Sequence, residues 1–120
     1  MRTRVRNVRD VLRAAWWTLL AVRSVRGQLR RGAFDGVVLS PPPPLPHRAG
    51  RGVEFVLSPL RPSCLERALV LQRWLAAHGR LHEVVVGVNK VGAQFTAHAW
   101  VDVEEPWQRG EFDEIARLGP

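Results

Sequence analysis

Apolar residues recur at spacings of three and four between residues 5 and 31 of the chain. This spacing places side chains on one side of an α-helix, so the sequence predicts a single helix over 5–31. The apolar run is too short to span a bilayer and no small-residue cleavage site follows it, so we expect neither a membrane span nor a signal peptide. The helix should pack over the domain, and the alternative is a docking surface anchored by Trp16 and Trp17. The apolar positions are Val8, Val11, Leu12, Ala15, Trp16, Leu19, Leu20 and Val22.

A second helical pattern follows Pro62. Ser63 is a favourable N-cap and Gly79 is a typical residue just beyond a helix end, so we predict a helix from about Ser63 to His78. Cys64 would be its first residue, at the tip of the apolar face that the following turns continue.

Beyond residue 82 the pattern changes to that of β-strands. The run 83–88 is rich in β-branched residues, and 94–103 alternates so that His98 and Trp100 share one face. Because the link between the two runs is short, we expect them to be antiparallel neighbours.

The remaining segments are less regular. We expect a reversal at 105–106, a third short strand over 109–113 and a last helical turn over 114–118. The proline run 41–46 is typical of a stiff polyproline spacer, whereas 53–57 fits either a short helix or a strand.

These elements predict an α+β fold, and with 46% hydrophobic residues the chain can bury a core. We divide it into an N-terminal basic amphipathic helix (1–36) that packs on or docks beside the core, a proline-rich linker (37–52) and a core (53–120). In the core, a helix should pack on a small antiparallel sheet.

Charge is distributed unevenly along the chain. It carries 18 Lys and Arg against 11 Asp and Glu, a net charge of +7. A basic N-terminal segment could meet nucleic acid, an anionic membrane or an acidic protein, but a solvated helix face is the simpler interpretation. The arginines of the first 31 residues are Arg2, Arg4, Arg6, Arg9, Arg13, Arg23, Arg26, Arg30 and Arg31, opposed only by Asp10.

The single cysteine of the chain, Cys64, excludes an internal disulfide and favours a cytoplasmic, reducing environment. Since there is no CxxC and no cysteine–histidine cluster, we predict no zinc site and no cofactor. A thiol at a helix N-terminus is favoured as thiolate, and a histidine such as His98 can take its proton and later hand it to a leaving group. The pair therefore indicates a thiolate nucleophile with a general base.

The motifs around these two residues resemble the transglutaminase-like cysteine proteases of lasso peptide biosynthesis, which remove the leader from lasso precursors. The resemblance covers about 62–103 well and the N-terminal helix loosely, and it implies a papain-like or transglutaminase-like core with a Cys-His-Asp triad. By it, Cys64 is the nucleophile and His98 the general base, in a stand-alone protease half without a separate leader-binding domain. The motifs are Cys64-Leu65-x-Arg67-Ala68-Leu69-x-Leu71-Gln72, then Gly87-Val88, then Ala97-His98-Ala99-Trp100-Val101.

Two acidic residues, Asp102 and Asp113, are candidates for the third member of the triad. Asp102 shares a face with His98 but lies four strand residues away, about 13 Å. In a hairpin centred on 105–106, Asp113 would lie directly opposite His98, with Cβ atoms about 5 Å apart. We therefore predict Asp113 as the orienting acid, although Glu111 or a β-bulge could change the register.

The predicted activity is that of a cysteine peptidase acting on a lasso precursor peptide. The resemblance implies two partners, a leader-recognition protein and a ring-closing lasso cyclase. The same triad could instead transfer the acyl group to an amine, and a non-enzymatic basic adaptor is the third possibility. Because no RNA-binding aromatic motif or helix-turn-helix is present, we do not expect a nucleic-acid partner.

The other histidines, His47, His78 and His82, lie outside any motif like that around His98, and we expect them at the surface.

Overall fold

The computed structural model describes all residues except 1, 34–35, 92 and 104–111. The chain divides into two compact units, Met1–Pro62 and Ser63–Pro120. Within the described part of the chain, no helix has the length and apolar character needed to cross a membrane.

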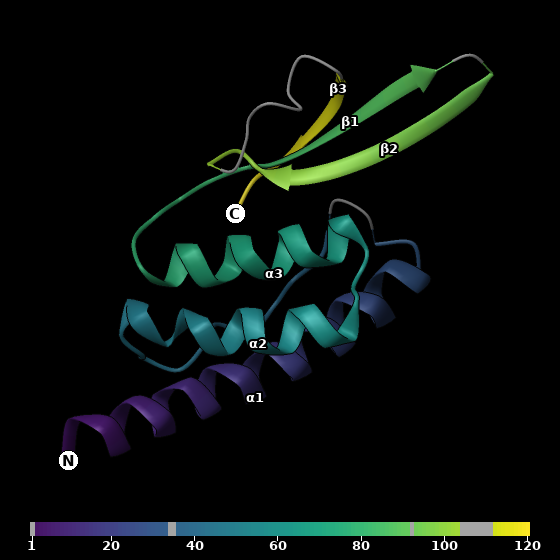
Figure 1. Cartoon of the computed structure of the whole chain (residues 1–120). Coiled ribbons are helices and arrows are strands. Elements are labelled where there is room, and N and C mark those ends of the chain that lie inside the picture. Colours follow the sequence, from purple (N-terminus) through teal and green to yellow (C-terminus); the bar gives the residue numbers. More distant parts are fainter. Residues whose placement is uncertain (1, 34–35, 92, 104–111) are drawn as a thin grey trace. The chain divides into compact units, whose positions relative to one another are not determined.

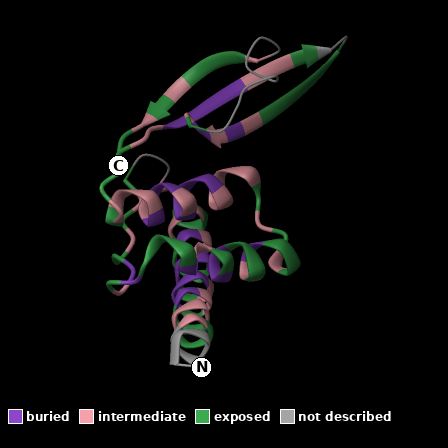
Figure 2. Cartoon of the chain, turned by 60° about the vertical axis from the view of Figure 1, so that its left-hand side comes forward, coloured by how far each residue is buried: buried purple, intermediate pink, exposed green. Residues whose placement is uncertain are grey.

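The first unit is built on α1, Arg2–Arg30, and α2, Gly50–Leu60. The segment 53–57, which fitted either helix or strand, is thus helical. The two helices approach closely at Gly52, where a Cβ would collide with the backbone oxygen of Val11 and lie 3.1 Å from the Ala14 Cβ. Only glycine fits this crossing. Figure 2 shows the buried residues of α1 on one side of the helix; the buried apolar residues of α1 and α2 are Ala14, Trp17, Ala21, Val22, Val25, Val53 and Leu57.

The proline-rich segment between the two helices is held to α1. The indole N–H of Trp17 donates to the Ser40 carbonyl at 3.0 Å, and the Gln28 amide exchanges two hydrogen bonds with the backbone of Val38 at 2.8 and 2.9 Å. Leu45 is buried, and the short 3-10 helix η1, His47–Ala49, leads into α2. The segment predicted as a linker therefore belongs to the packing of this unit.

The second unit opens with α3, Cys64–Ala77. Its N-terminus carries a capping box: the Ser63 hydroxyl accepts from the Glu66 N–H at 3.2 Å, and the Glu66 carboxylate accepts from the Ser63 N–H at 2.8 Å. The helix ends before Gly79, whose φ of 75° is typical of a residue that follows a helix. The predicted helix and its N-cap are confirmed.

The second unit continues with β1 (Val84–Val91), β2 (Gln94–Val101) and β3 (Asp113–Leu118). β1 and β2 are antiparallel neighbours, as predicted, and the sheet order is β2-β1-β3 (Figure 1). At the end of the sheet away from the β1–β2 turn, the residues on one face of β1 and β2 are buried, namely Val84, Val86, Ala99 and Val101. Gln72 ties α3 to the sheet, because its amide donates to the carbonyls of His82 (3.0 Å) and Leu118 (2.9 Å).

The expected pairing of the third strand is wrong. β3 pairs antiparallel with β1, on the edge opposite β2, so β2 and β3 form no hairpin. Its residues 114–118, expected as a helical turn, are extended, and the centre of the predicted hairpin lies outside the described residues. The hairpin prediction assumed the shortest connection, whereas β1 offers unpaired N–H and C=O groups along its free edge, and pairing them fixes the extended conformation of β3.

Candidate active site

Cys64 is the first residue of α3 and is half-exposed. The cap engages the N–H of Glu66, and the N–H of Arg67 donates to the Ser63 carbonyl at 2.9 Å. The N–H groups of Cys64 and Leu65 precede the first intrahelical hydrogen bond, so they can serve an incoming oxyanion. The capping box thus fixes the conformation of the turn that presents the thiol.

His98 lies in the middle of β2, half-exposed, and pairs with Gly87 of β1. The contacts of α3 with the sheet are mainly with β2, so the helix of Cys64 packs on the strand of His98. No hydrogen bond joins the Cys64 thiol to the His98 ring among the described residues. The structure therefore brings the two elements together without a direct bond between the two side chains.

Two aromatic rings lie beside His98. Its ring stacks on Trp100 at a centroid distance of 5.7 Å and meets Phe112 at 5.6 Å, and the two aromatic rings lie 6.0 Å apart. Gly87 makes this cluster possible, because a Cβ there would come within 2.9 Å of the Phe112 Cβ and 3.1 Å of the Trp100 ring. Without a side chain at Gly87, Trp100 of β2 and Phe112, the residue before β3, meet above the central strand. The predicted placement of Trp100 on the same face as His98 is confirmed.

The register does not place Asp113 opposite His98. It is exposed at the start of β3 and pairs with Val88, the neighbour of Gly87. Since consecutive strand residues point to opposite faces, the register places Asp113 on the face away from His98. The hairpin register that selected Asp113 was wrong, and its catalytic role stays a prediction.

Glu114 has the register that Asp113 lacks, because it pairs with Gly87 and so belongs to the His98 face. Its carboxylate binds Arg117, whose guanidinium also reaches Glu83 at 3.4 Å. The hydrogen bond from Arg117 to Glu114 raises the pKa of Arg117. The two acids at the start of β3 thus differ: Asp113 lies on the face away from His98, whereas Glu114 lies on the His98 face and is paired with Arg117.

The sequence interpretation missed a histidine–carboxylate pair. His82 Nδ1 lies 2.8 Å from Asp102 Oδ1, and each side chain is 24% exposed. The backbone supports the pair, because the Asp102 N–H donates to the Glu83 carbonyl at 2.9 Å. His82, expected at the surface, is partly exposed, and the partner that it has there was not expected. The signal was the register: once Val84 pairs with Val101, Glu83 lies opposite Asp102, and His82 is the residue just before Glu83.

Comparison with known proteins identifies a family over nearly the whole chain. The transglutaminase-like superfamily matches residues 5–118, so the match includes α1 as well as the helix of Cys64 and the sheet. No curated protein and no solved structure matches the chain.

Proposed function

The chain belongs to the transglutaminase-like superfamily, a group broadly of cysteine proteases and transferases, and from this premise we propose that it is a cysteine peptidase. Its substrate would be a ribosomally made lasso precursor peptide, from which it removes the leader. The motifs from Cys64 to Trp100 support this substrate by resemblance to lasso leader peptidases. The single observation that carries the proposal is the packing of α3, with Cys64 as its first residue, on the strand of His98.

In the proposed reaction, the Cys64 thiolate attacks the carbonyl carbon of the last leader residue. The N–H groups of Cys64 and Leu65 hold the oxyanion as the tetrahedral intermediate forms. His98 donates its proton to the leaving amine of the core peptide, and the carbonyl is left as a thioester on Cys64. Water then attacks the thioester, with His98 as general base, and releases a leader carboxylate and the free thiol.

Asp113 is the acid we propose for the triad. The Cys-His-Asp order of the chain and the family resemblance support it, whereas the register of β3 supports Glu114, which shares the face of His98. Substitution of the two residues separates these assignments, as argued in the Discussion.

The proposed partners are the precursor peptide, a leader-recognition protein and a ring-closing cyclase, acting together in the cytoplasm. A transferase with the same residues is the alternative activity. It would deliver the leader acyl group to an amine in place of water.

The test is incubation of the chain with a lasso precursor and its leader-recognition protein, followed by intact-mass analysis with and without added hydroxylamine. A leader that ends in a free carboxylate in both reactions supports the peptidase. A hydroxamate in place of the carboxylate at low hydroxylamine would indicate the transferase. No conversion of the precursor by correctly folded protein would overturn both, and the basic adaptor would then become the leading hypothesis.

A further inference from the structure

The apolar pattern of α1 covers two faces of the helix, and only one of them is used by the fold. The inner face packs in the core, where Trp17 is 7% exposed. On the opposite side, Trp16 is 63% exposed, in line with three other exposed apolar residues at four-residue spacing. We call this side the outer face of α1; its apolar members are Val8, Leu12, Trp16 and Leu20, exposed by 59, 62, 63 and 47%.

Single exposed apolar side chains are ordinary, but several in one row form a continuous patch, and such patches mark interaction sites. Trp16 matters most, because tryptophan combines a large apolar area with little conformational entropy to lose and is enriched at the centre of protein interfaces. Trp16 and Trp17 were both expected as anchors in the docking alternative, but their positions differ. Trp17 is part of the core, whereas Trp16 points outward.

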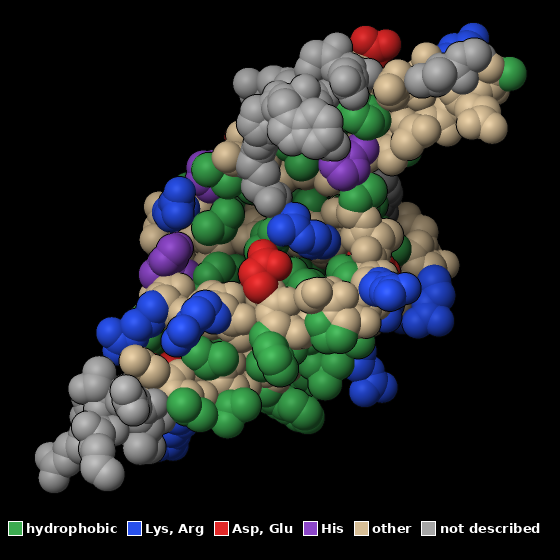
Figure 3. All heavy atoms as spheres, viewed as in Figure 1, with side chains coloured by type: hydrophobic (Ala, Val, Ile, Leu, Met, Phe, Trp, Pro, Cys, Tyr) green, Lys and Arg blue, Asp and Glu red, His purple; other side chains and the backbone are tan. Residues whose placement is uncertain are grey.

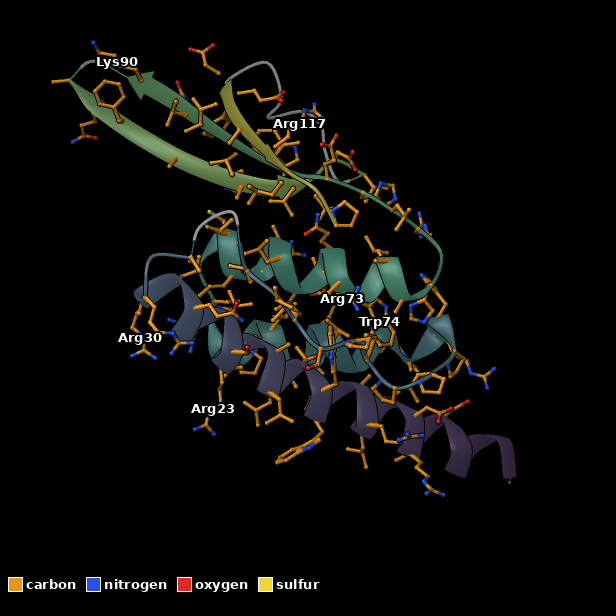
Figure 4. All side chains as sticks on the ribbon, turned by 180° about the vertical axis from the view of Figure 1, so that it is seen from behind. Arg23, Arg30, Arg73, Trp74, Lys90 and Arg117 are labelled. Atoms are coloured by element: carbon orange, nitrogen blue, oxygen red, sulfur yellow. The ribbon has the colours of Figure 1, made fainter. Side chains whose placement is uncertain are left out.

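The charges on this face have one sign. Arg9, Arg13 and Arg23 are exposed, and the side chain of Arg23 projects away from α1 in Figure 4. Arg9 and Arg23 lie seven residues before and after Trp16, which is two helical turns, so both fall almost on its line. The space-filling view in Figure 3 shows hydrophobic side chains gathered with Lys and Arg side chains beside them at the place of α1. Arginines therefore lie on the line of the apolar patch, Arg9 within its first turn and Arg23 just beyond Leu20.

We propose that the outer face of α1 docks a second protein through an acidic, amphipathic surface, with an apolar pocket for Trp16 and carboxylates around its rim. A membrane fits less well, because Arg9 lies on the line of the apolar residues, whereas an in-plane helix keeps its cations on a separate polar face. Nucleic acid would use the arginines but would gain nothing from Leu12 and Leu20. A central tryptophan with an arginine rim is the composition of a protein-binding hot spot. This inference is independent of the proposed peptidase activity.

The experiment measures binding of the full chain to a short amphipathic helical peptide built of leucine and glutamate, by fluorescence anisotropy of the labelled peptide. We expect a dissociation constant in the roughly micromolar range. Trp16→Ala should weaken binding by about ten-fold or more. The double variant Arg9→Glu, Arg13→Glu should weaken it as strongly, and a peptide with lysine in place of glutamate should bind this variant in preference to the unaltered chain.

Two matched controls lie in the same unit off the outer face. Phe55→Ala removes another exposed aromatic residue (75% exposed), and Arg48→Glu reverses an exposed charge. Both should bind the acidic peptide as the unaltered chain does, with the same circular dichroism spectrum as all other variants.

Three results would overturn the proposal. The first is no binding of the acidic peptide, and the second is an equal loss in the control variants. The third is that vesicles of phosphatidylcholine and phosphatidylglycerol bind more tightly than the peptide and lose that binding with Trp16→Ala, which would make the outer face a membrane-binding surface.

Discussion

His82 and His98 belong to the same small unit but have opposite surroundings. His82 is held by a carboxylate 2.8 Å away, at the end of the sheet where Gln72 also binds its backbone carbonyl. His98 lies beside two aromatic rings and has, among the described residues, no hydrogen-bonded carboxylate. A histidine–carboxylate pair is therefore not by itself the mark of a catalytic base. What distinguishes His98 is the helix that packs on its strand, because that helix begins with the only thiol of the chain.

The largest effect is expected at the nucleophile. Cys64→Ala and Cys64→Ser should abolish leader removal, with a loss of at least about 10³-fold, because no other thiol can form the acyl intermediate. The measurement is the mass of the products from precursor and leader-recognition protein, beside the thermal unfolding midpoint of each variant. Since Cys64 is half-exposed, the fold should be retained. Leader removal at the normal rate by Cys64→Ala would exclude the peptidase mechanism.

The two histidines give the direct test of the comparison. His98→Gln should lower the cleavage rate by at least about 10³-fold, because glutamine cannot take and return a proton. His82→Gln should change it by less than about ten-fold, since this residue acts on the stability of the sheet end. Both rates are measured in single turnover at saturating precursor. If His82→Gln were the inactive variant, the roles of the two histidines would have to be exchanged.

Substitution at the start of β3 shows whether His98 uses a carboxylate as well as aromatic rings. Asp113→Asn should slow cleavage by about 10²- to 10⁴-fold if it completes the triad. Glu114→Gln should stay within about ten-fold, because its carboxylate is engaged by Arg117. The alkylation rate of Cys64, measured against pH in both variants, separates a change in thiolate formation from a loss of fold. The reverse order would assign the role to Glu114, and two rates near that of the unaltered chain would leave the aromatic rings as the support of His98.

Local signals predicted α3 and the β1–β2 pair. The position of β3 and the His82–Asp102 pair depend instead on contacts between residues distant in sequence. The cap of α3 is made by Ser63 and Glu66, neighbours in the chain, so residue types alone placed Cys64 at a helix start. The position of β3 depends on which edge of β1 it pairs with, and no local pattern encodes that choice. The His82–Asp102 pair was missed for the same reason, since it requires the register of two strands.

A smaller effect is expected at Gly87, above which the rings of Trp100 and Phe112 meet. Gly87→Ala should displace Phe112 and Trp100, since the added Cβ would come within 2.9 Å of the Phe112 Cβ. Overpacking of this kind costs about 1–3 kcal/mol of stability. We expect kcat to fall by about ten-fold with KM little changed, because a loosened His98 ring acts in the chemical step.

The matched control for Gly87→Ala is Gly119→Ala, whose added Cβ would have no neighbour within 4 Å. Side-chain NMR of the histidines adds a readout that loss of stability alone would not move: the His98 resonances should shift in Gly87→Ala, while those of His82 should not. Equal shifts of both histidines would mean that the whole sheet had rearranged and that the aromatic cluster has no specific role.

The smallest effect is expected at the other histidine. Asp102→Asn and His82→Gln should each lower the free energy of unfolding by roughly 1 kcal/mol, the usual contribution of a partly exposed hydrogen-bonded pair. The two changes should not be additive, because each removes the same hydrogen bond between the ends of β1 and β2. Urea unfolding of the two single variants and the double variant gives the interaction energy. Additive losses would mean that the interaction between the two side chains contributes nothing to stability. A large loss of cleavage in Asp102→Asn would show that His82 has a role in the reaction as well as in stability.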